Sequence, residues 1–106
     1  QDCVGVFLSV DIDVVDPGMA PGTGTPEPGG LTSRELLEAV RRIALEVPVV
    51  GMDIVEVSPP YDCADITAIL ANRVALEVLS ATAHKKNNEK NKSSEPYNPK
   101  RNLLDR

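Results

Sequence analysis

The stretch LSVDIDVVDPGMAPGTGTPEPGG, residues 8–30, closes an apolar run with three aspartates and then turns to proline and glycine. The run itself, from residue 4 to residue 10, is almost continuously apolar and rich in β-branched types. Such a run is typical of a strand covered on both faces of a parallel sheet. Residues 17–30 hold four prolines and five glycines and predict a long irregular loop. Loops of this length often carry function.

A helix and a second strand are predicted after the loop. Thr32 and Glu35 fit a capping box, in which a hydroxyl and a carboxylate satisfy the first free amides of a helix. Apolar residues at helical spacing follow over 36–46. Residues 49–55 form a second apolar run that, like the first, closes on acidic residues. The pattern therefore predicts strand, loop, helix and strand in that order.

The remainder of the chain predicts one more helix and then a tail. Apolar residues recur at helical spacing over about 66–81, and Asp62 or Asp65 is placed to cap this helix. Residues 83–106 are polar and lysine-rich, with almost nothing to bury, and predict disorder. We therefore expect an ordered part over residues 1–82 and a disordered C-terminal tail.

The element order β-α-β-α predicts the α/β class with parallel strands. Two strands joined by a helical crossover lie parallel, so both acidic strand ends fall at the same carboxyl edge. Open α/β sheets bind their ligands at that edge. Two buried strands also need neighbouring strands and a covering layer on each face. We therefore expect the chain to be a fragment of a larger domain that begins upstream of it.

Charge and cysteine content limit the partners and the compartment. Residues 1–82 hold 4 Lys and Arg against 13 Asp and Glu, an acidic balance that argues against nucleic acid. The acidic balance is compatible with metal ions or small cationic molecules as ligands. No apolar run approaches the roughly 20 residues of a membrane span, and no secretory signal is present. Cys3 and Cys63 have no paired spacing and predict free thiols, so we expect a cytoplasmic or mitochondrial protein.

The aspartates at the first strand end suggest a metal site. Asp11 and Asp13 are two residues apart, so in an extended strand their side chains point to the same face. Carboxylates this close repel unless a cation lies between them, and oxygen ligands favour magnesium or manganese. The D-x-D pattern alone also occurs in phosphoryl-transfer enzymes, in glycosyltransferases and in ordinary turns. A purely structural role in capping the loop is the alternative.

Further acidic residues near the two strand ends have competing interpretations. Glu56 would stand beside the aspartate pair, where its two-oxygen face matches a guanidinium group, or it would be a solvated loop residue. Asp16 precedes a proline, where aspartate commonly forms a turn. Asp53 lies inside the second strand and could accept hydrogen bonds from a neighbouring loop. His84, the single histidine, is expected to be exposed in the tail.

Four segments in this order resemble the C-terminal part of the ureohydrolase family, which comprises arginase, agmatinase and relatives. They are SVDIDVVDP at residues 9–17, APGTGTP at 20–26, GGLT at 29–32 and MDIVEVSP at 52–59. The resemblance spans about residues 4–81 and is closest to agmatinase-type sequences. It implies a three-layer α/β/α parallel-sheet domain that hydrolyses agmatine to putrescine and urea. The intact enzyme is then expected to be a homo-oligomer.

The resemblance also assigns roles to individual residues. It implies a binuclear manganese (Mn2+) site, in which Asp11 bridges the two metal ions and Asp13 binds one of them. It further implies that Glu56 holds the substrate guanidinium and that Thr25 belongs to the substrate loop. Asp16 and Asp53 would support the metal ligands. The remaining ligands and the histidine expected to move protons lie upstream, so the chain alone is expected to be inactive.

Two other functions stay open from the sequence. The first is a magnesium-dependent phosphotransferase with a strand-terminal D-x-D, although Val14-Val-Asp-Pro17 replaces the small residues usual after that pattern. The second is a non-catalytic ureohydrolase-like subunit that keeps the fold but lacks the upstream ligands. The upstream sequence would decide between the second alternative and an enzyme.

Overall fold

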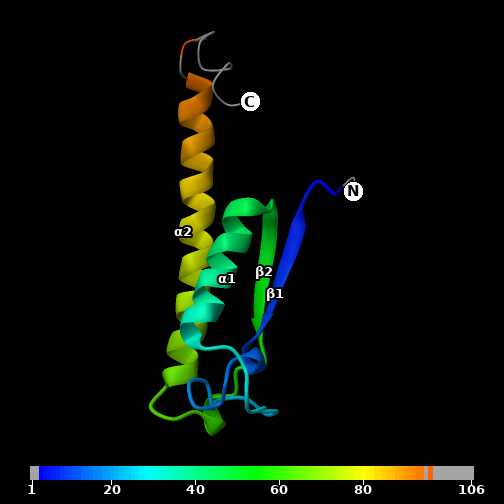
Figure 1. Cartoon of the computed structure of the whole chain (residues 1–106), viewed down its shortest axis with the longest axis vertical. Coiled ribbons are helices and arrows are strands. Elements are labelled where there is room, and N and C mark those ends of the chain that lie inside the picture. Colours follow the sequence, from blue (N-terminus) through cyan, green and yellow to red (C-terminus); the bar gives the residue numbers. More distant parts are fainter. Residues whose placement is uncertain (1–2, 95, 97–106) are drawn as a thin grey trace.

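The chain folds into two parallel strands and two helices, described by a computed structural model for residues 3–94 and 96. The elements are β1 (Val6–Asp11), η1 (Ile12–Val14), α1 (Ser33–Glu46), β2 (Val49–Val55), η2 (Pro59–Tyr61) and α2 (Ile66–Ser94), where η denotes a short 3-10 helix. β1 and β2 pair in parallel, with α1 as the crossover between them (Figure 1). The predicted β-α-β-α order and parallel pairing are confirmed.

The register of the two strands places their acidic ends together. Val10 lies opposite Ile54, and Asp11 lies opposite Val55, the last residue of β2. Glu56 follows Val55 directly, so it lies one residue beyond the partner of Asp11. The two acidic strand ends therefore meet at one carboxyl edge, as the crossover rule predicts.

Helix α1 begins where its sequence predicts. The Thr32 hydroxyl accepts a hydrogen bond of 3.1 Å from the backbone N–H of Glu35, and the Glu35 carboxylate accepts one of 3.4 Å from the N–H of Thr32. This reciprocal pair is a complete capping box. A hydroxyl cap of this kind contributes about 1 kcal/mol to stability. It fixes the residue at which the loop after β1 becomes helix.

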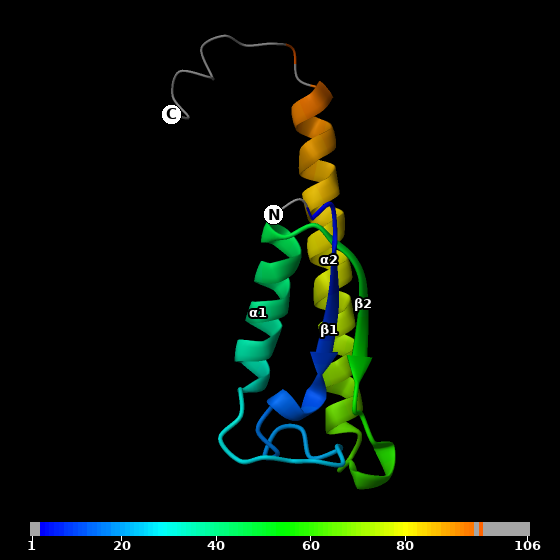
Figure 2. The same ribbon diagram turned by 90° about the vertical axis from the view of Figure 1, so that its right-hand side faces the viewer.

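Both helices lie on the same side of the sheet (Figures 1 and 2), and the buried side chains of the core come from these helices, from β1 and from the segment after β1. Val10 points into this core and is 5% exposed, whereas Phe7 on the other face is 62% exposed. Within the described residues the helices cover only one face of β1, and the second covering layer that the sequence leads us to expect would come from the rest of a larger domain. The side chains buried in the core are Val10, Ile12, Val15, Ala20, Leu36, Val40, Ala44, Leu70, Val74, Val78 and Ala81.

Helix α2 is longer than the sequence predicts. Residues 83–94, expected to be disordered, continue the helix as far as Ser94 and project beyond α1 (Figure 1). Adding a residue to a formed helix requires no buried surface, and the segment contains alanine, lysine and glutamate but no glycine or proline. Lys85 also ties the extension to the body by donating a 3.2 Å hydrogen bond to the carbonyl of Val47. The rest of the predicted tail, except residue 96, lies outside the described residues.

The apolar content of α2 is also higher than expected. By length and composition alone this helix could cross a membrane. No continuous apolar run reaches the length of a membrane span, because Asn72, Arg73 and Glu77 interrupt it, but the mean hydropathy of the helix is 1.3 over an 18-residue window. Within the fold, Leu70, Val74 and Val78 of α2 are buried in the core, as in the core helix of an α/β domain.

Candidate active site at the carboxyl edge

Asp11 and Asp13 come together through a turn. β1 ends at Asp11, and Asp13 lies in η1, so the two residues do not share an extended strand as the sequence predicted. Asp11 instead caps η1, because its Oδ1 accepts a 3.1 Å hydrogen bond from the backbone N–H of Asp13. The expected proximity of the two aspartates is present, but its cause is side-chain capping of a tight turn.

Thr25 brings the loop of residues 17–30 back to this aspartate pair. Its hydroxyl donates a 2.8 Å hydrogen bond to Oδ2 of Asp13. Thr25 is exposed, and Asp13 is half-buried. Because a threonine hydroxyl can orient a carboxylate from one side, the open side of Asp13 remains available to a ligand. The structure thus joins the predicted substrate loop to a predicted metal ligand.

Asp16 closes the loop on itself. Its carboxylate accepts hydrogen bonds from the backbone N–H groups of Gly18, at 2.9 Å, and Gly29, at 3.0 Å. These two bonds hold the pKa of Asp16 below its ordinary value, the Gly18 bond having the larger effect. Asp16 therefore forms a turn, the simpler of its two predicted roles, and it fixes the two ends of the loop that carries Thr25.

The loop has two further anchors that the sequence did not reveal. The first anchor is Gly30, whose backbone lies against the segment that follows β1. A Cβ at Gly30 would lie 2.6 Å from the carbonyl oxygen of Val14. At the other anchor, the N–H of Gly22 donates a 2.8 Å hydrogen bond to the hydroxyl of Thr67 in α2. The carbonyl of Gly22 accepts a 2.7 Å hydrogen bond from the N–H of Ser58. The loop is thus attached to the segments that follow β2.

Asp62 is the cap of α2, and it lies beneath the same loop. Its carboxylate accepts hydrogen bonds from the backbone N–H groups of Thr67, at 3.0 Å, and Ala68, at 3.1 Å. Partial burial raises the pKa of this carboxyl, but the bonds from Ala68 and Thr67 outweigh burial and leave the pKa below its ordinary value. Of the two candidate caps, Asp62 and Asp65, the structure selects Asp62.

Glu56 has an unusual backbone. Its φ is 68°, in the left-handed region that residues other than glycine rarely adopt. Its side chain is exposed, and within residues 3–94 no hydrogen bond or ion pair engages its carboxylate. Backbone strain of this kind costs of order 1–3 kcal/mol and is concentrated at functional sites. A strained, unpaired carboxylate beside the aspartate pair is consistent with a ligand-binding role.

Asp53 interacts with the neighbouring strand and not with the aspartate pair. The hydroxyl of Ser9 donates a 2.6 Å hydrogen bond to Oδ1 of Asp53, and the two residues are register partners. Both side chains are exposed on the face of the sheet opposite the helices. A role for Asp53 in supporting the metal ligands remains a prediction, because its observed partner is Ser9.

The aspartate pair fits part of a metal site. Oδ2 of Asp11 and Oδ1 of Asp13 have no hydrogen-bond partner among the described residues, so each can offer one oxygen to a hard cation. No cluster of three or more His, Cys, Asp or Glu side chains suited to a metal occurs within residues 3–94. Two carboxylates are too few to hold such an ion firmly, so a bound ion would need further ligands from outside these residues.

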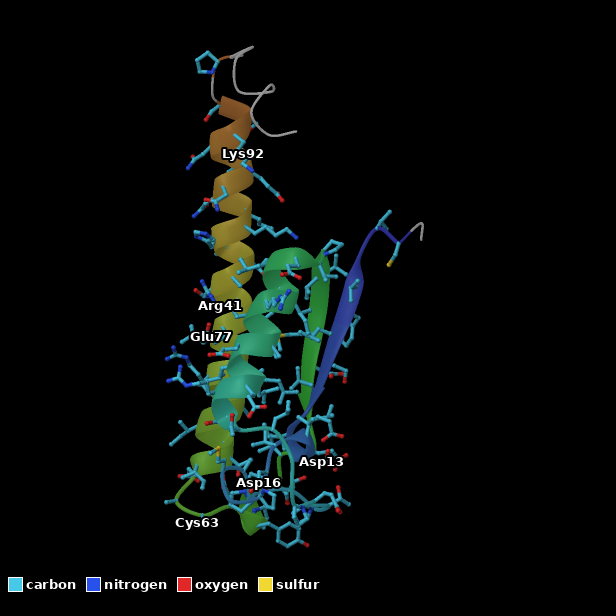
Figure 3. All side chains as sticks on the ribbon, viewed as in Figure 1. Asp13, Asp16, Arg41, Cys63, Glu77 and Lys92 are labelled. Carbon is cyan, nitrogen blue, oxygen red and sulfur yellow. The ribbon has the colours of Figure 1, made fainter. Side chains whose placement is uncertain are left out.

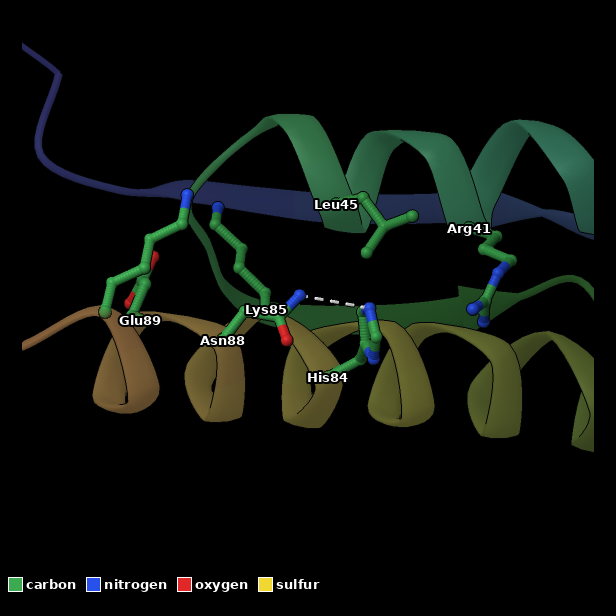
Figure 4. Close-up of a pocket in the computed structure, with 7 residues that line it drawn as sticks. Arg41, Leu45, His84, Lys85, Asn88 and Glu89 are labelled. Atoms are coloured by element: carbon green, nitrogen blue, oxygen red, sulfur yellow. Dashed lines mark hydrogen bonds between the residues drawn. The ribbon is translucent and has the colours of Figure 1, made fainter. Parts of the chain in front are cut away.

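A pocket lies far from this edge, where α1 ends beside the extension of α2. It has a volume of about 330 Å³ and is lined by Arg41, Leu45, His84, Lys85, Asn88, Glu89 and Lys92 (Figure 4). Arg41 pairs with Glu77 at 3.4 Å, and His84 bonds Asn88 at 3.2 Å. Asp13 and Asp16 lie at the opposite end of the fold (Figure 3). The pocket and the aspartate pair are therefore separate features, and His84 is not part of the candidate site.

The fold and these side chains define a parallel α/β protein with a cluster of acidic side chains at the carboxyl edge of its sheet. The family model described as the Arginase family matches residues 1–81. The chain belongs to the Arginase family, which confirms the resemblance noted from its motifs.

Individual relatives match this chain over the same segment. The proclavaminate amidinohydrolase of Streptomyces clavuligerus is 55% identical over 82 residues, which are 76% of this chain and 26% of that protein. An agmatinase of Cronobacter sakazakii is 56% identical over 81 residues, again 76% of this chain and 26% of the relative. A solved structure of the Streptomyces clavuligerus enzyme superimposes with a TM-score of 0.72 at 53% identity, covering 76% of this chain and 27% of that chain. The chain thus spans roughly a quarter of the length of these relatives.

Proposed function

We propose that residues 1–81 form the carboxyl-edge part of a metal-dependent hydrolase that acts on a linear guanidino compound. Agmatine is the proposed substrate, and putrescine and urea are the proposed products. Membership of the Arginase family supports the reaction class, and the agmatinases among the relatives support the substrate. The observation that carries the proposal is the cluster of Asp11, Asp13 and Thr25 with Glu56 at the same edge.

Asp11 and Asp13 are the proposed metal ligands of this chain. Their unpaired oxygens suit manganese, and the other ligands of a binuclear centre would come from residues outside the chain. When bound, two such ions supply a hydroxide nucleophile near neutral pH. Thr25 would hold the Asp13 carboxylate in one orientation through its 2.8 Å hydrogen bond. Asp16 would act indirectly by closing the loop that carries Thr25.

Glu56 is the proposed binding group for the substrate cation. A guanidinium is planar and presents parallel N–H donors, which a carboxylate accepts through both oxygens. The Glu56 carboxylate has no competing partner within residues 3–94. Its left-handed backbone fixes the direction in which the side chain leaves β2. Glu56 would thus orient the guanidinium carbon towards the metal edge without taking part in bond making.

A second candidate is a non-catalytic member of the same family. The aspartate pair by itself is an incomplete site, as expected of a segment that spans about a quarter of the relatives' length, so it fits a non-catalytic member as well as an enzyme. The phosphotransferase alternative has no such support, since the chain belongs to the Arginase family. The two remaining candidates predict different results when the rest of a catalytic subunit surrounds this segment. An enzyme segment should then support hydrolysis of the guanidino substrate, and a non-catalytic one should not.

A chimera tests this difference directly. Residues 1–81 would replace the matching segment of the Cronobacter sakazakii agmatinase, which is 56% identical over 81 residues. We expect manganese-dependent urea release from agmatine, and we expect Asp11→Asn to abolish it. The matched control is Asp65→Asn, which changes an exposed acid in the loop before α2 and suits its φ of 60°. A folded chimera that binds manganese but releases no urea would show the non-catalytic alternative to be right.

A further inference from the structure

The pocket between α1 and the extension of α2 is built largely by residues outside the Arginase-family match. That match ends at residue 81. Five of the seven described lining residues come after this point, namely His84, Lys85, Asn88, Glu89 and Lys92. Their spacing of three or four positions places them on one face of the helix, which is turned towards Arg41 and Leu45 of α1 (Figure 4). The pocket is therefore not part of the segment that this chain shares with the family.

Positive charge is in excess in the lining of this pocket, which we call the basic pocket. It contains Arg41, Lys85 and Lys92, with Glu89 as the single carboxylate among the described lining residues. Within residues 3–94 no ion pair engages Lys85 or Lys92. Lys85 donates a 3.2 Å hydrogen bond to the neutral carbonyl of Val47, which holds its side chain without cancelling its charge. Both lysines therefore keep a positive charge that a ligand could use.

Arg41 adds to this excess although it is paired. Its Nη1 lies 3.4 Å from the Glu77 carboxylate, and the same carboxylate lies 2.9 Å from Nη2 of Arg73. Because two guanidinium groups share one carboxylate, one positive charge is left uncompensated. The Arg41 side chain is also 43% exposed, and a guanidinium has further N–H donors besides the one used at Glu77. Arg41 can therefore bind an oxygen ligand in the pocket while it stays paired.

The chemistry of the lining favours a ligand with several negatively charged oxygen atoms. Arginine and lysine only donate hydrogen bonds, and the Asn88 amide adds further donors. Leu45 is the one large apolar side chain among the described lining residues, so an apolar ligand would find little to contact. A phosphoryl group carries up to two negative charges and three strong acceptor oxygens, and it forms charge-assisted hydrogen bonds with arginine and lysine. It therefore matches both the charge and the donors of the basic pocket.

We propose that the basic pocket binds the phosphoryl group of a small molecule, either inorganic diphosphate or a phosphate ester. Its volume of about 330 Å³ lies at the lower end of the range for small-ligand pockets. A long nucleic acid is the competing occupant, but residues 1–82 hold 13 Asp and Glu against 4 Lys and Arg, which would repel a strand extending past the pocket. The proposal does not depend on the function proposed above, because the aspartate pair lies at the opposite end of the fold (Figure 3).

Titration of the full chain with inorganic diphosphate, and separately with glycerol phosphate, tests the proposal. His84 is the only histidine of the sequence, so the NMR signals of its imidazole report directly on the basic pocket. We expect these signals to shift in step with saturable binding measured by calorimetry. Lys85→Gln with Lys92→Gln should weaken the binding about tenfold or more, because each change removes a charge-assisted hydrogen bond. Lys86→Gln with Lys90→Gln is the matched control, since it removes the same charge from α2 outside this pocket.

A variant that gains affinity guards against loss of structure as the explanation. Glu89→Gln removes the single carboxylate from the described lining and should therefore tighten the binding of both probes. Misfolding cannot produce such a gain, so unchanged or weaker binding by this variant would count against the proposal. Circular dichroism of the purified variants would check that α2 remains helical.

The remaining outcomes separate the possible ligands. Tighter binding of glycerol phosphate would assign the basic pocket to phosphate esters, and tighter binding of diphosphate would assign it to the inorganic anion. His84 signals that stay in place with both probes would overturn the proposal. Equal weakening by the two lysine pairs would do the same, because general charge on the helix would then explain the binding. So would a single-stranded oligonucleotide that binds more tightly than either probe and is weakened equally by both pairs.

Discussion

Thr25 and Asp13 are joined by a hydrogen bond of 2.8 Å that spans an irregular loop and ends at the carboxyl edge of the sheet. The bond matters because Asp13 lies in a short turn and not in the strand, so the strand does not by itself fix its side chain. The Asp11 carboxylate holds the turn from one side, and Thr25 holds the Asp13 carboxylate from the other. The orientation of a proposed metal ligand thus depends on a loop residue.

Removal of the Thr25 hydroxyl should weaken catalysis without unfolding the protein. The Thr25 hydroxyl donates to a carboxylate, and hydrogen bonds to charged groups are worth about 1.5–3 kcal/mol. Because Thr25 is exposed, the lower value applies, and it corresponds to roughly a tenfold change in kcat/KM. We therefore expect Thr25→Val in the agmatinase chimera to lose about that factor and to need more manganese for half-maximal activity. Thr25→Ser keeps the hydroxyl and should behave as the parent. Equal activity of the valine and serine variants would exclude this orienting role.

Neutralising Glu56 should lower kcat/KM for the substrate and leave the stability of the protein unchanged. Charge-assisted hydrogen bonds to a guanidinium are worth about 1.5–3 kcal/mol, so Glu56→Gln in the chimera should lower kcat/KM for agmatine by about 10–100-fold. The melting temperature should stay the same, because the carboxylate has no partner within residues 3–94. Glu27→Gln, an exposed acid of the loop, serves as the control. A melting temperature that falls along with activity would mean that Glu56 is structural.

Two glycines of the same loop should respond differently to alanine. A Cβ on Gly30 would lie 2.6 Å from the Val14 carbonyl oxygen and 2.7 Å from the Asp16 nitrogen, both backbone atoms that cannot move aside independently. Overpacking of this kind costs about 1–3 kcal/mol, so Gly30→Ala should lower the free energy of unfolding of the chimera by that amount. A Cβ on Gly24 would meet nothing within 4 Å, and Gly24→Ala should be neutral. Denaturant titration of both variants measures the difference, and equal values would contradict the observed loop path.

Features of the fold set by neighbouring residues were predictable from the sequence. Thr32 and Glu35 are three positions apart, and their mutual capping depends only on the local helix start. The parallel pairing of β1 and β2 followed from a general rule about helical crossovers. The meeting of two acidic strand ends at one edge followed in turn from that pairing. These predictions needed no knowledge of distant contacts.

Features that depend on distant contacts were not predictable in the same way. The segment after the turn at Asp13 pairs with Leu31, near the end of the loop. The Leu31 carbonyl accepts a hydrogen bond from the N–H of Asp16, and the Leu31 N–H donates one to the carbonyl of Val14. The Gly22 anchor depends on Thr67, 45 positions away. The length of α2 was underestimated for another reason, because a segment that buries little can still extend a helix that the core has already formed.

Acid should open the loop by protonating Asp16. Backbone hydrogen bonds, first from Gly18 and then from Gly29, hold the pKa of Asp16 in the folded protein below the value of 3.8 expected when unfolded. A lowered pKa means that the stabilisation is fully present above 3.8 and is lost as the pH falls through the lower folded value. We therefore expect Asp16→Asn in the chimera to be less stable than the parent at neutral pH, with the gap closing as the pH drops below 3.8. Asp65→Asn, which alters an exposed acid away from this loop, should show no such convergence. Melting temperatures recorded across the acid range would measure the gap, and a gap that stays constant with pH would rule out loop closure by the ionised Asp16.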